Sequence, residues 1–210
     1  MMLPVETLTL LAFIPAGLAL NLTPGADMMF CLGQGLKGGR RAAMAANFGI
    51  AAGGMVHVTL AALGLGALVA AHPAAFELIR WLGVGYLLWL AQSALRSPLP
   101  VVGVDVVPLP ALRVFGQALM VNLLNPKVIL FILAFLPQFV NPARPILPQF
   151  LTLGVVFAIG GLIVNGAVGL FAGSIGQRLA RSAGFARWLG RISAGIFGML
   201  ALRLALLQRN

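Results

Sequence analysis

The chain has 210 residues, of which 60% are hydrophobic and only 9% are charged. About a quarter of the residues in a soluble domain are charged. The composition therefore excludes a soluble enzyme, a disordered protein and a nucleic-acid-binding protein, and it indicates an integral membrane protein. In such a protein the net charge of +10, from 14 basic and 4 acidic residues, is first a guide to topology.

Six apolar stretches reach the length of about 20 residues that a membrane-spanning helix needs. They lie at about 6–34, 43–70, 75–95, 113–138, 149–174 and 187–207. The start, MMLPVETLTL, has no basic segment ahead of its apolar run, so we expect no cleaved signal peptide. The sequence predicts an all-α, polytopic membrane protein with six transmembrane helices and a single domain over 1–210.

Basic residues concentrate in or just after the first, third and fifth of the predicted loops, at about 35–41, 96–110 and 177–187. Loops on the cytoplasmic side of a membrane carry an excess of Lys and Arg. We therefore predict that these loops face the cytoplasm and that both termini lie outside. The alternative for some of these residues is a role in helix capping or in anchoring at the membrane interface.

The sequence also repeats itself at a constant offset. Arg-Trp-Leu-Gly at 80–83 recurs at 187–190, and Gly-Gly at 53–54 recurs at 160–161, in each case 107 residues later. We predict one repeat over about 1–96, a linker over about 97–112 and a second repeat over about 113–210. Because each repeat holds three helices, the second must cross the membrane in the opposite direction, which makes the repeats inverted.

Two prolines lie inside predicted spans at matching places in the repeats. Pro24 with Gly25 is expected to break the first helix, and Pro126 after Asn125 is expected to break the fourth. Backbone groups freed in this way must meet protein, water or a ligand. Ordinary proline kinks are the alternative, but paired breaks at a repeat interface are where many transporters bind substrate.

An ionisable residue follows each break, and these two residues are the strongest candidates for a functional site. Asp27 follows Pro24, and Lys127 follows Pro126. A charge at membrane depth costs about 2.5 kcal/mol or more, so each must face the bundle interior and find a partner. One interpretation is a salt bridge that fastens the two repeats; the other is direct contact with substrate or protons.

A free amino acid fits this pair of charges well. Its ammonium group can meet Asp27, while its carboxylate can meet Lys127 or the freed N–H groups of a half-helix. Burial disfavours the charged form of a carboxylate, so Asp27 is also a candidate for coupling transport to protons.

Several polar residues lie near the breaks or within the second span. Those near the breaks are candidates for substrate binding, with interhelical bonding and helix capping as the alternative; they are Asn21, Thr23, Asn122 and Asn125. His57, in the second span, is a second proton-coupling candidate, and its alternative role is a hydrogen bond to a neighbouring helix.

No residue set for catalysis or metal binding stands out. An enzyme would need a nucleophile with its base or paired carboxylates, and a metal site would need a cluster of His, Cys, Asp or Glu. The chain has one Cys and two His, and Asp27 is the acid that lies clearly within a span. We expect neither an enzyme, a metal site nor a cofactor. A channel-like pore built from the same residues stays open as an alternative.

Two motifs in the chain resemble one family. Asn-Leu-Thr-Pro-Gly-Ala-Asp at 21–27 resembles the first signature of the lysine exporter (LysE/RhtB) family, in particular its homoserine/threonine branch. Asn-Leu-Leu-Asn-Pro-Lys at 122–127, followed by Phe-Leu-Pro-Gln-Phe at 135–139, is similar to the second signature. Ala26 departs from the pattern, because many members of the family have a second proline there.

The resemblance implies a multi-pass exporter of amino acids in the bacterial inner membrane, which exchanges its substrate for protons by alternating access. Its partners would be an amino acid, protons and the lipid bilayer, with no nucleic acid, and a homo-oligomer stays open. Because we find no second acid for a cationic side chain, we expect neutral or hydroxylated substrates similar to threonine or homoserine. Basic amino acids or another small solute are the alternatives.

Overall fold

The computed structural model of the protein describes residues 4–71, 73–96, 109–172 and 183–206. In these ranges the regular structure is helical, which confirms the all-α prediction. The α-helices are α1 (Thr7–Leu22), α2 (Ala26–Ala71), α3 (Pro73–Arg96), α4 (Ala111–Leu123), α5 (Pro126–Leu130), α6 (Ile146–Leu170) and α8 (Ala183–Leu206). A π-helical turn, η1 (Phe131–Phe135), and a 3-10 turn, η2 (Leu136–Phe139), follow α5. Most of the predicted linker at about 97–112 lies outside the described residues.

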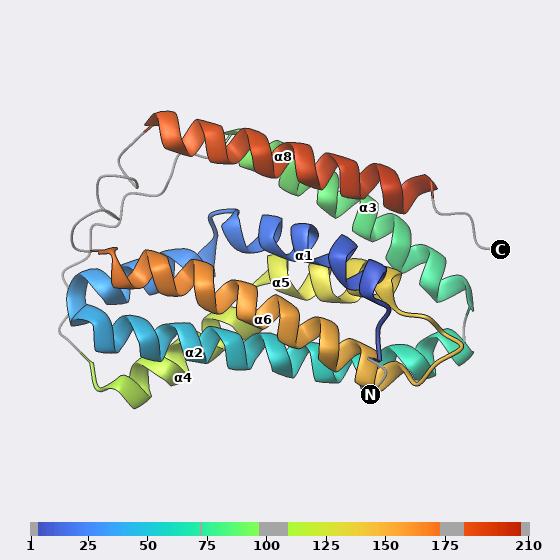
Figure 1. Ribbon diagram of the computed structural model, residues 1–210, viewed down its shortest axis with the longest axis horizontal. Helices are drawn as coiled ribbons and strands as arrows, with labels where there is room; N and C mark the ends of the chain where they lie inside the picture. Colours follow the sequence, from blue (N-terminus) through green and yellow to red (C-terminus); the bar gives the residue numbers. More distant parts are fainter. Residues whose placement is uncertain (1–3, 72, 97–108, 173–182, 207–210) are drawn as a thin grey trace.

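The long helix α2 consists of two arms that reverse at Gly39. This glycine has φ 67°, a left-handed conformation that residues with a Cβ atom rarely adopt. Gly35 before the reversal and Ala43 after it both pack against Gly169 of α6, which a straight helix could not do. The arms, over 26–38 and 40–71, therefore run in opposite directions, as Figure 1 shows.

The first arm of α2 continues the path of α1 along α6. Glu6, just before α1, bonds to Arg144, just before α6; Asn21 bonds to Phe157 in the middle of α6; and Gly35 packs near its end. With 25 residues, α6 is about 37 Å long, more than the roughly 30 Å hydrocarbon core of a bilayer. The interrupted path from α1 to Gly39 runs beside most of α6 and therefore has a similar length.

The second broken path consists of α4 and the segment from α5 to η2. Its two parts, Ala111–Leu123 and Pro126–Phe139, are bent by 53° relative to each other. The second arm of α2 packs along α4 at glycines, because a Cβ atom at Gly49 would collide with the backbone of Phe115. Close helix contacts at small residues are typical of membrane bundles.

Five buried phenylalanines fill the space between α1, α6 and the segment from η1 to η2. Neighbouring ring centroids lie 4.9–6.3 Å apart, within the range of favourable aromatic pairs. The members of this phenylalanine cluster are Phe13, Phe131, Phe135, Phe139 and Phe157. An open pocket near the start of α1 borders the cluster at Phe139 and also contains Glu6 and Arg144.

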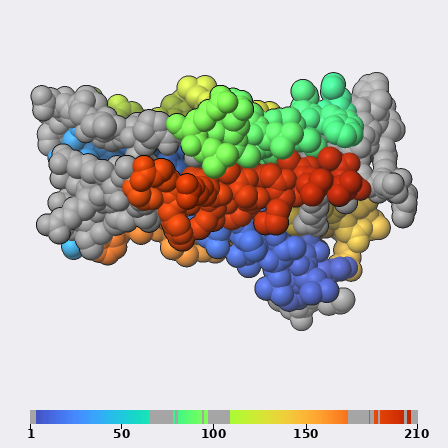
Figure 2. Space-filling view, turned by 90° about the horizontal axis from the view of Figure 1, so that it is seen from above, coloured from blue at the N-terminus to red at the C-terminus, as the bar shows by residue number. Residues whose placement is uncertain are grey.

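Helices α3 and α8 pack side by side and cover one face of the molecule (Figure 2). Their outer sides carry large exposed apolar side chains, such as Leu82, Trp89, Met199 and Leu202. Buried asparagines and an exposed apolar surface are the reverse of a soluble protein, and they fit a chain surrounded by lipid.

By length and apolar composition, two described helices can cross a membrane, Ala26–Gly64 and Ile146–Leu170, and the bent pair makes a third if it counts as one span. The reversal at Gly39 means that Ala26–Gly64 is not one straight rod. The break at 23–25 lies at the predicted Pro24-Gly25 break of the span 6–34, and Gly39 lies in the predicted loop at 35–41, before the span 43–70. The six-span arrangement stays a prediction.

Candidate functional site

The first break exposes backbone carbonyl groups at the end of α1. In a continuous helix the carbonyl of Leu20 would accept a hydrogen bond from residue 24, but Pro24 has no N–H to donate. The Lys127 ammonium group takes this place and donates to the carbonyls of Leu20 at 3.1 Å and Thr23 at 2.8 Å. The Thr23 hydroxyl donates to the Ala19 carbonyl at 2.7 Å. The end of α1 is therefore held by a residue of the other predicted repeat.

The second break places Lys127 through local capping. The side-chain oxygen of Asn125 accepts a hydrogen bond from the Lys127 backbone N–H at 3.0 Å, so Asn125 is the N-cap of α5. Pro126 is the first residue of α5, where its fixed φ suits a helix and its missing N–H costs nothing. Asn-Pro-Lys is thus a compact helix start that directs the lysine side chain towards α1.

Asp27 lies in the first turn of α2 and faces the second break. Its Oδ2 accepts a hydrogen bond of 2.8 Å from the side chain of Asn122, which is buried. Asp27 and Lys127 do not form a direct salt bridge in this state. Among the described residues, the pair with a nitrogen–oxygen distance within 4.0 Å is Arg144 and Glu6. Each break therefore supplies the hydrogen-bonding partner of a charge on the other.

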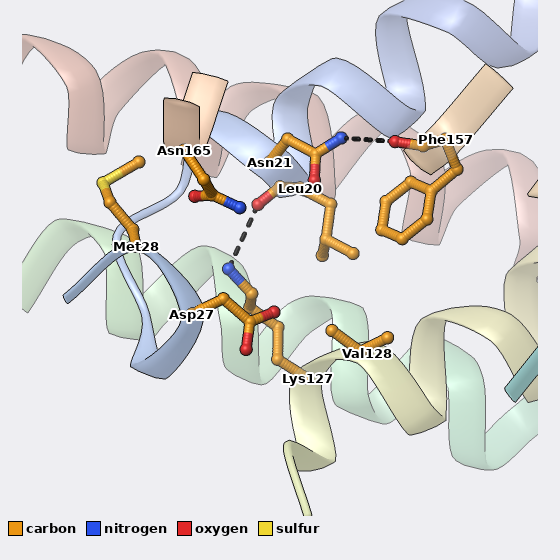
Figure 3. Close-up of a pocket in the computed structure, with 8 residues that line it drawn as sticks. All are labelled: Leu20, Asn21, Asp27, Met28, Lys127, Val128, Phe157 and Asn165. Atoms are coloured by element: carbon orange, nitrogen blue, oxygen red, sulfur yellow. Dashed lines mark hydrogen bonds between the residues drawn. The ribbon is translucent and has the colours of Figure 1, made fainter. Parts of the chain in front are cut away.

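Asp27 and Lys127 line one cavity at the meeting point of the breaks (Figure 3). Its other lining residues are Leu20, Asn21, Met28, Val128, Phe157 and Asn165. The cavity has room for about one water molecule, so it is too small to hold an amino acid in this state. Three buried polar atoms in and beside it lack a partner: Oδ1 of Asp27, Oδ1 of Asn122 and Nδ2 of Asn125. Buried polar atoms are normally paired, and unpaired ones are places where a ligand or water can bind.

The other candidates from the sequence lie around the cavity. Asn21 lines it, but its amide donates to the Phe157 carbonyl at 3.1 Å. Thr23 and Asn125 cap helices, and Gly25 lies against the Lys127 side chain, where a Cβ atom would meet Nζ at 3.0 Å.

His57 lies outside the cavity and contacts the second break. Its Nε2 is 3.3 Å from the carbonyl oxygen of Asn122. A carbonyl only accepts, so Nε2 carries the proton in this contact. The side chain of Asn122 in turn bonds Asp27, and this connects His57 to the cavity indirectly.

Sequence reasoning did not select Met28, Phe157 or Asn165 as cavity residues. Apolar side chains such as Met28 and Phe157 carry no distinguishing signal in so apolar a chain. Asn165 does have one, since it is a polar residue in the interior of the long apolar stretch 149–174. No group of three or more metal-binding side chains occurs in the described part of the chain.

Two broken helices that bring buried polar groups together inside an apolar bundle are a recurring plan of secondary transporters. The fold and the site thus define a membrane transport protein. The chain belongs to the LysE family: the model of the LysE type translocators matches residues 18–208. Proteins of this family are transporters and not enzymes, as the sequence predicted.

Individual relatives are similar over most of the chain. An uncharacterized membrane protein of Vibrio cholerae is 35% identical over 77% of this chain and 80% of its own length. A homoserine/homoserine lactone efflux protein of Salmonella typhimurium is 34% identical over 73% of this chain and 75% of its own. A leucine efflux protein of Salmonella choleraesuis is 30% identical over 93% of this chain and 94% of its own length. No solved structure matches the chain significantly.

Proposed function

We propose that this protein exports neutral or hydroxylated amino acids from the cytoplasm across the bacterial inner membrane, in exchange for protons. The observation that carries the proposal is the cavity in which Asp27 and Lys127 meet between two broken helices. One negative and one positive group complement an amino acid zwitterion. Relatives that are named for efflux of homoserine and of leucine support this class of substrate.

Competition for one carboxylate gives a physical basis for the exchange. Oδ1 of Asp27 is buried without a partner, while Oδ2 keeps its bond to Asn122. A proton or the ammonium group of a substrate can each satisfy Oδ1, but not both together. Binding of one therefore displaces the other, which is the requirement for antiport. We propose His57 as a second proton carrier, linked to Asp27 through Asn122.

The transport path is proposed to consist of six spans in two inverted repeats. Matching contacts support this arrangement: a Cβ atom at Gly53 would meet Asn122, and one at Gly160, its repeat counterpart, would meet Asn21. Each asparagine lies one turn before its own break. The first span would then be α1 with the first arm of α2, which explains why neither half is long enough by itself.

The orientation follows from charge. The start of α1 and the end of α8 lie at the same end of the molecule (Figure 1). The opposite end holds the reversal at Gly39 with Lys37, Arg40 and Arg41, together with the basic residues that end α3 and begin α4 and α8. Under the positive-inside rule that end faces the cytoplasm, and both termini face outside.

Alternating access is proposed because the cavity is too small for a substrate in this state. An amino acid is larger than the available space, so the two breaks must separate to admit it. The charges suit a neutral side chain, because Asp27 is the acid that lines the cavity and it is used by the substrate ammonium group.

The direct test is uptake of labelled amino acids into everted membrane vesicles that contain the protein. We expect saturable uptake of homoserine, threonine or leucine that rises when the vesicle interior is made acidic and that stops when a protonophore removes the gradient. Vesicles from cells without the protein are the control.

Other results would replace the proposal in specific ways. Uptake of lysine or arginine in preference to neutral amino acids would establish a basic substrate. Large unitary conductance without saturation would establish a channel. Uptake that does not respond to the pH gradient would disprove proton exchange.

A further inference from the structure

Asn165 is a buried asparagine whose amide is directed into the central cavity and is not used by the protein. It lies on α6, is 4% exposed and lines the cavity with Asp27 and Lys127. Among the described residues its side chain makes no hydrogen bond, whereas Asn21, Asn122 and Asn125 each make one. Figure 3 shows the amide nitrogen directed toward the Leu20 carbonyl, which accepts from Lys127 on the other side of the cavity. Buried amides are normally paired, so this one is available to a ligand.

The other asparagines at the breaks already have structural tasks. Asn21 donates to the Phe157 carbonyl, Asn122 donates to Asp27, and Asn125 caps α5. Asn165 differs from all three, because both its donor and its acceptor are free for a bound molecule.

The wall around Asn165 is apolar. The cavity residues other than the asparagines and the two charges are Leu20, Met28, Val128 and Phe157. When the two charges hold the ammonium and carboxylate groups of an amino acid, its side chain must lie against this wall. Asn165 is then the polar group left to contact that side chain. Gly161, one turn earlier on α6, separates this amide from Asn21, since a Cβ atom there would lie 3.2 Å from Oδ1 of Asn21 and 3.9 Å from Nδ2 of Asn165.

We propose that Asn165 determines specificity by hydrogen bonding to a hydroxyl group on the substrate side chain, which makes short hydroxylated amino acids the preferred substrates. The proposal rests on the transport function proposed above and narrows its substrate class. An amide both donates and accepts, so it can satisfy a hydroxyl completely. An apolar side chain of the same size would leave the amide buried without a partner, and this penalty lowers affinity.

The test compares two amino acids that differ only in this group. Homoserine and norvaline have side chains of similar length, one ending in a hydroxyl and the other in a methyl group. In everted vesicles the protein is expected to prefer homoserine by on the order of ten- to a hundredfold in uptake at low concentration. Asn165→Leu, which has a similar volume and no polar atom, is expected to remove most of this preference by lowering homoserine uptake and retaining norvaline uptake.

Asn47→Leu is the matched control. Asn47 is also a buried asparagine of a helix that packs on α6, but its amide donates to the Leu162 carbonyl and it does not line the cavity. The Asn47→Leu variant should change the uptake of homoserine and of norvaline by the same factor. If Asn165→Leu fails to insert in the membrane, Asn165→Ala removes the same amide without adding an apolar branch.

Each outcome has a distinct meaning. Loss of the homoserine preference in the Asn165 variants, with the preference kept in Asn47→Leu, supports the proposal. An unchanged preference in the Asn165 variants, or a norvaline preference in the unaltered protein, overturns it and leaves the transport function intact. Uptake of leucine without homoserine overturns the specificity role alone. If the unaltered protein takes up none of homoserine, norvaline, threonine and leucine, the transport function itself is wrong, and the specificity role falls with it.

Discussion

The two helix breaks occupy matching places in the sequence, yet the chain completes them in different ways. At the first break, α1 ends with carbonyls that Lys127 satisfies from the other break, and regular α-helix resumes at Ala26. At the second break Asn125 caps the next helix itself, and α5 passes after one turn into π-helical and 3-10 turns. The first break depends on a distant residue, whereas the second is built locally.

The asparagine before each break shows the same difference. Asn21 bonds to the Phe157 carbonyl, a backbone group whose position is set by α6. Asn122 bonds to the Asp27 carboxylate, a group that can gain a proton or bind a cation. We therefore expect the second break to respond to changes at Asp27, and its irregular turns suit movement, since π-helical and 3-10 segments often mark functional sites and hinges.

The largest effect is expected from Lys127→Met. It removes the ammonium group that holds the end of α1 and leaves two carbonyls without a charged partner. Each of the two lost hydrogen bonds stabilises the fold by about 1.5–3 kcal/mol. We expect pH-driven uptake to fall to roughly the background of vesicles without the protein and thermal unfolding in detergent to begin at a lower temperature. Lys37→Met, in the first arm of α2 near Gly39, is the matched control. It should keep both the pH-driven uptake and the unfolding temperature of the unaltered protein. Normal uptake by Lys127→Met would contradict the role of Lys127 at the first break.

Asp27→Asn should abolish pH-driven uptake with little change in stability. The amide oxygen can still accept the bond from Asn122, so we expect the free energy of unfolding to change by less than about 1 kcal/mol. Binding of a proton or an ammonium group is lost because the charge is gone. Uptake and thermal unfolding should be measured on the same preparation. Glu6→Gln, which removes an exposed acid, serves as the control, and pH-driven uptake by Asp27→Asn would rule out proton exchange at this residue.

A direct comparison of the breaks is possible with Asn122→Ala and Asn21→Ala. The first leaves the buried Asp27 carboxylate without its donor, and we expect uptake to fall about tenfold or more. The second removes a donor from a carbonyl that keeps its helical partner in α6, so a loss below about threefold is expected. Initial uptake rates at limiting substrate measure both. Equal losses would show that the two breaks respond alike.

A smaller effect than that of Asn122→Ala is expected at Gly53, the glycine that faces Asn122. A Cβ atom at Gly53 would lie 2.7 Å from Oδ1 and 2.9 Å from Cβ of Asn122, whereas one at Gly54 would meet nothing within 4 Å. Gly53→Ala should destabilise the protein by about 1–3 kcal/mol and slow uptake a few-fold, and Gly54→Ala should change neither. The comparison is made by measuring the thermal unfolding temperatures of the two variants. Similar unfolding temperatures would argue against a close contact between α2 and the second break.

The sequence predicted the all-α fold, the membrane class and the family because these depend on composition and on local motifs. The helix ends near Pro24 and Pro126 follow from the chemistry of proline alone. The carbonyl groups that accept hydrogen bonds from Lys127 could not be predicted from the sequence. They lie more than a hundred residues away along the chain, and only the tertiary structure brings them to the lysine. Asn165 was not selected either: periodicity places no single face of so apolar a helix toward a cavity, and the free amide is visible only from its neighbours.

The phenylalanine cluster between the central cavity and the open pocket near α1 has a consequence for electrical insulation. Phe157 lines the cavity and Phe139 lines the outer pocket, so the rings fill the space between two polar regions. Protons move along continuous files of water, and packed rings leave no room for one. An exporter driven by a proton gradient loses that gradient through any such file. The proton exchange proposed above requires insulation of this kind between the cavity and the outer pocket.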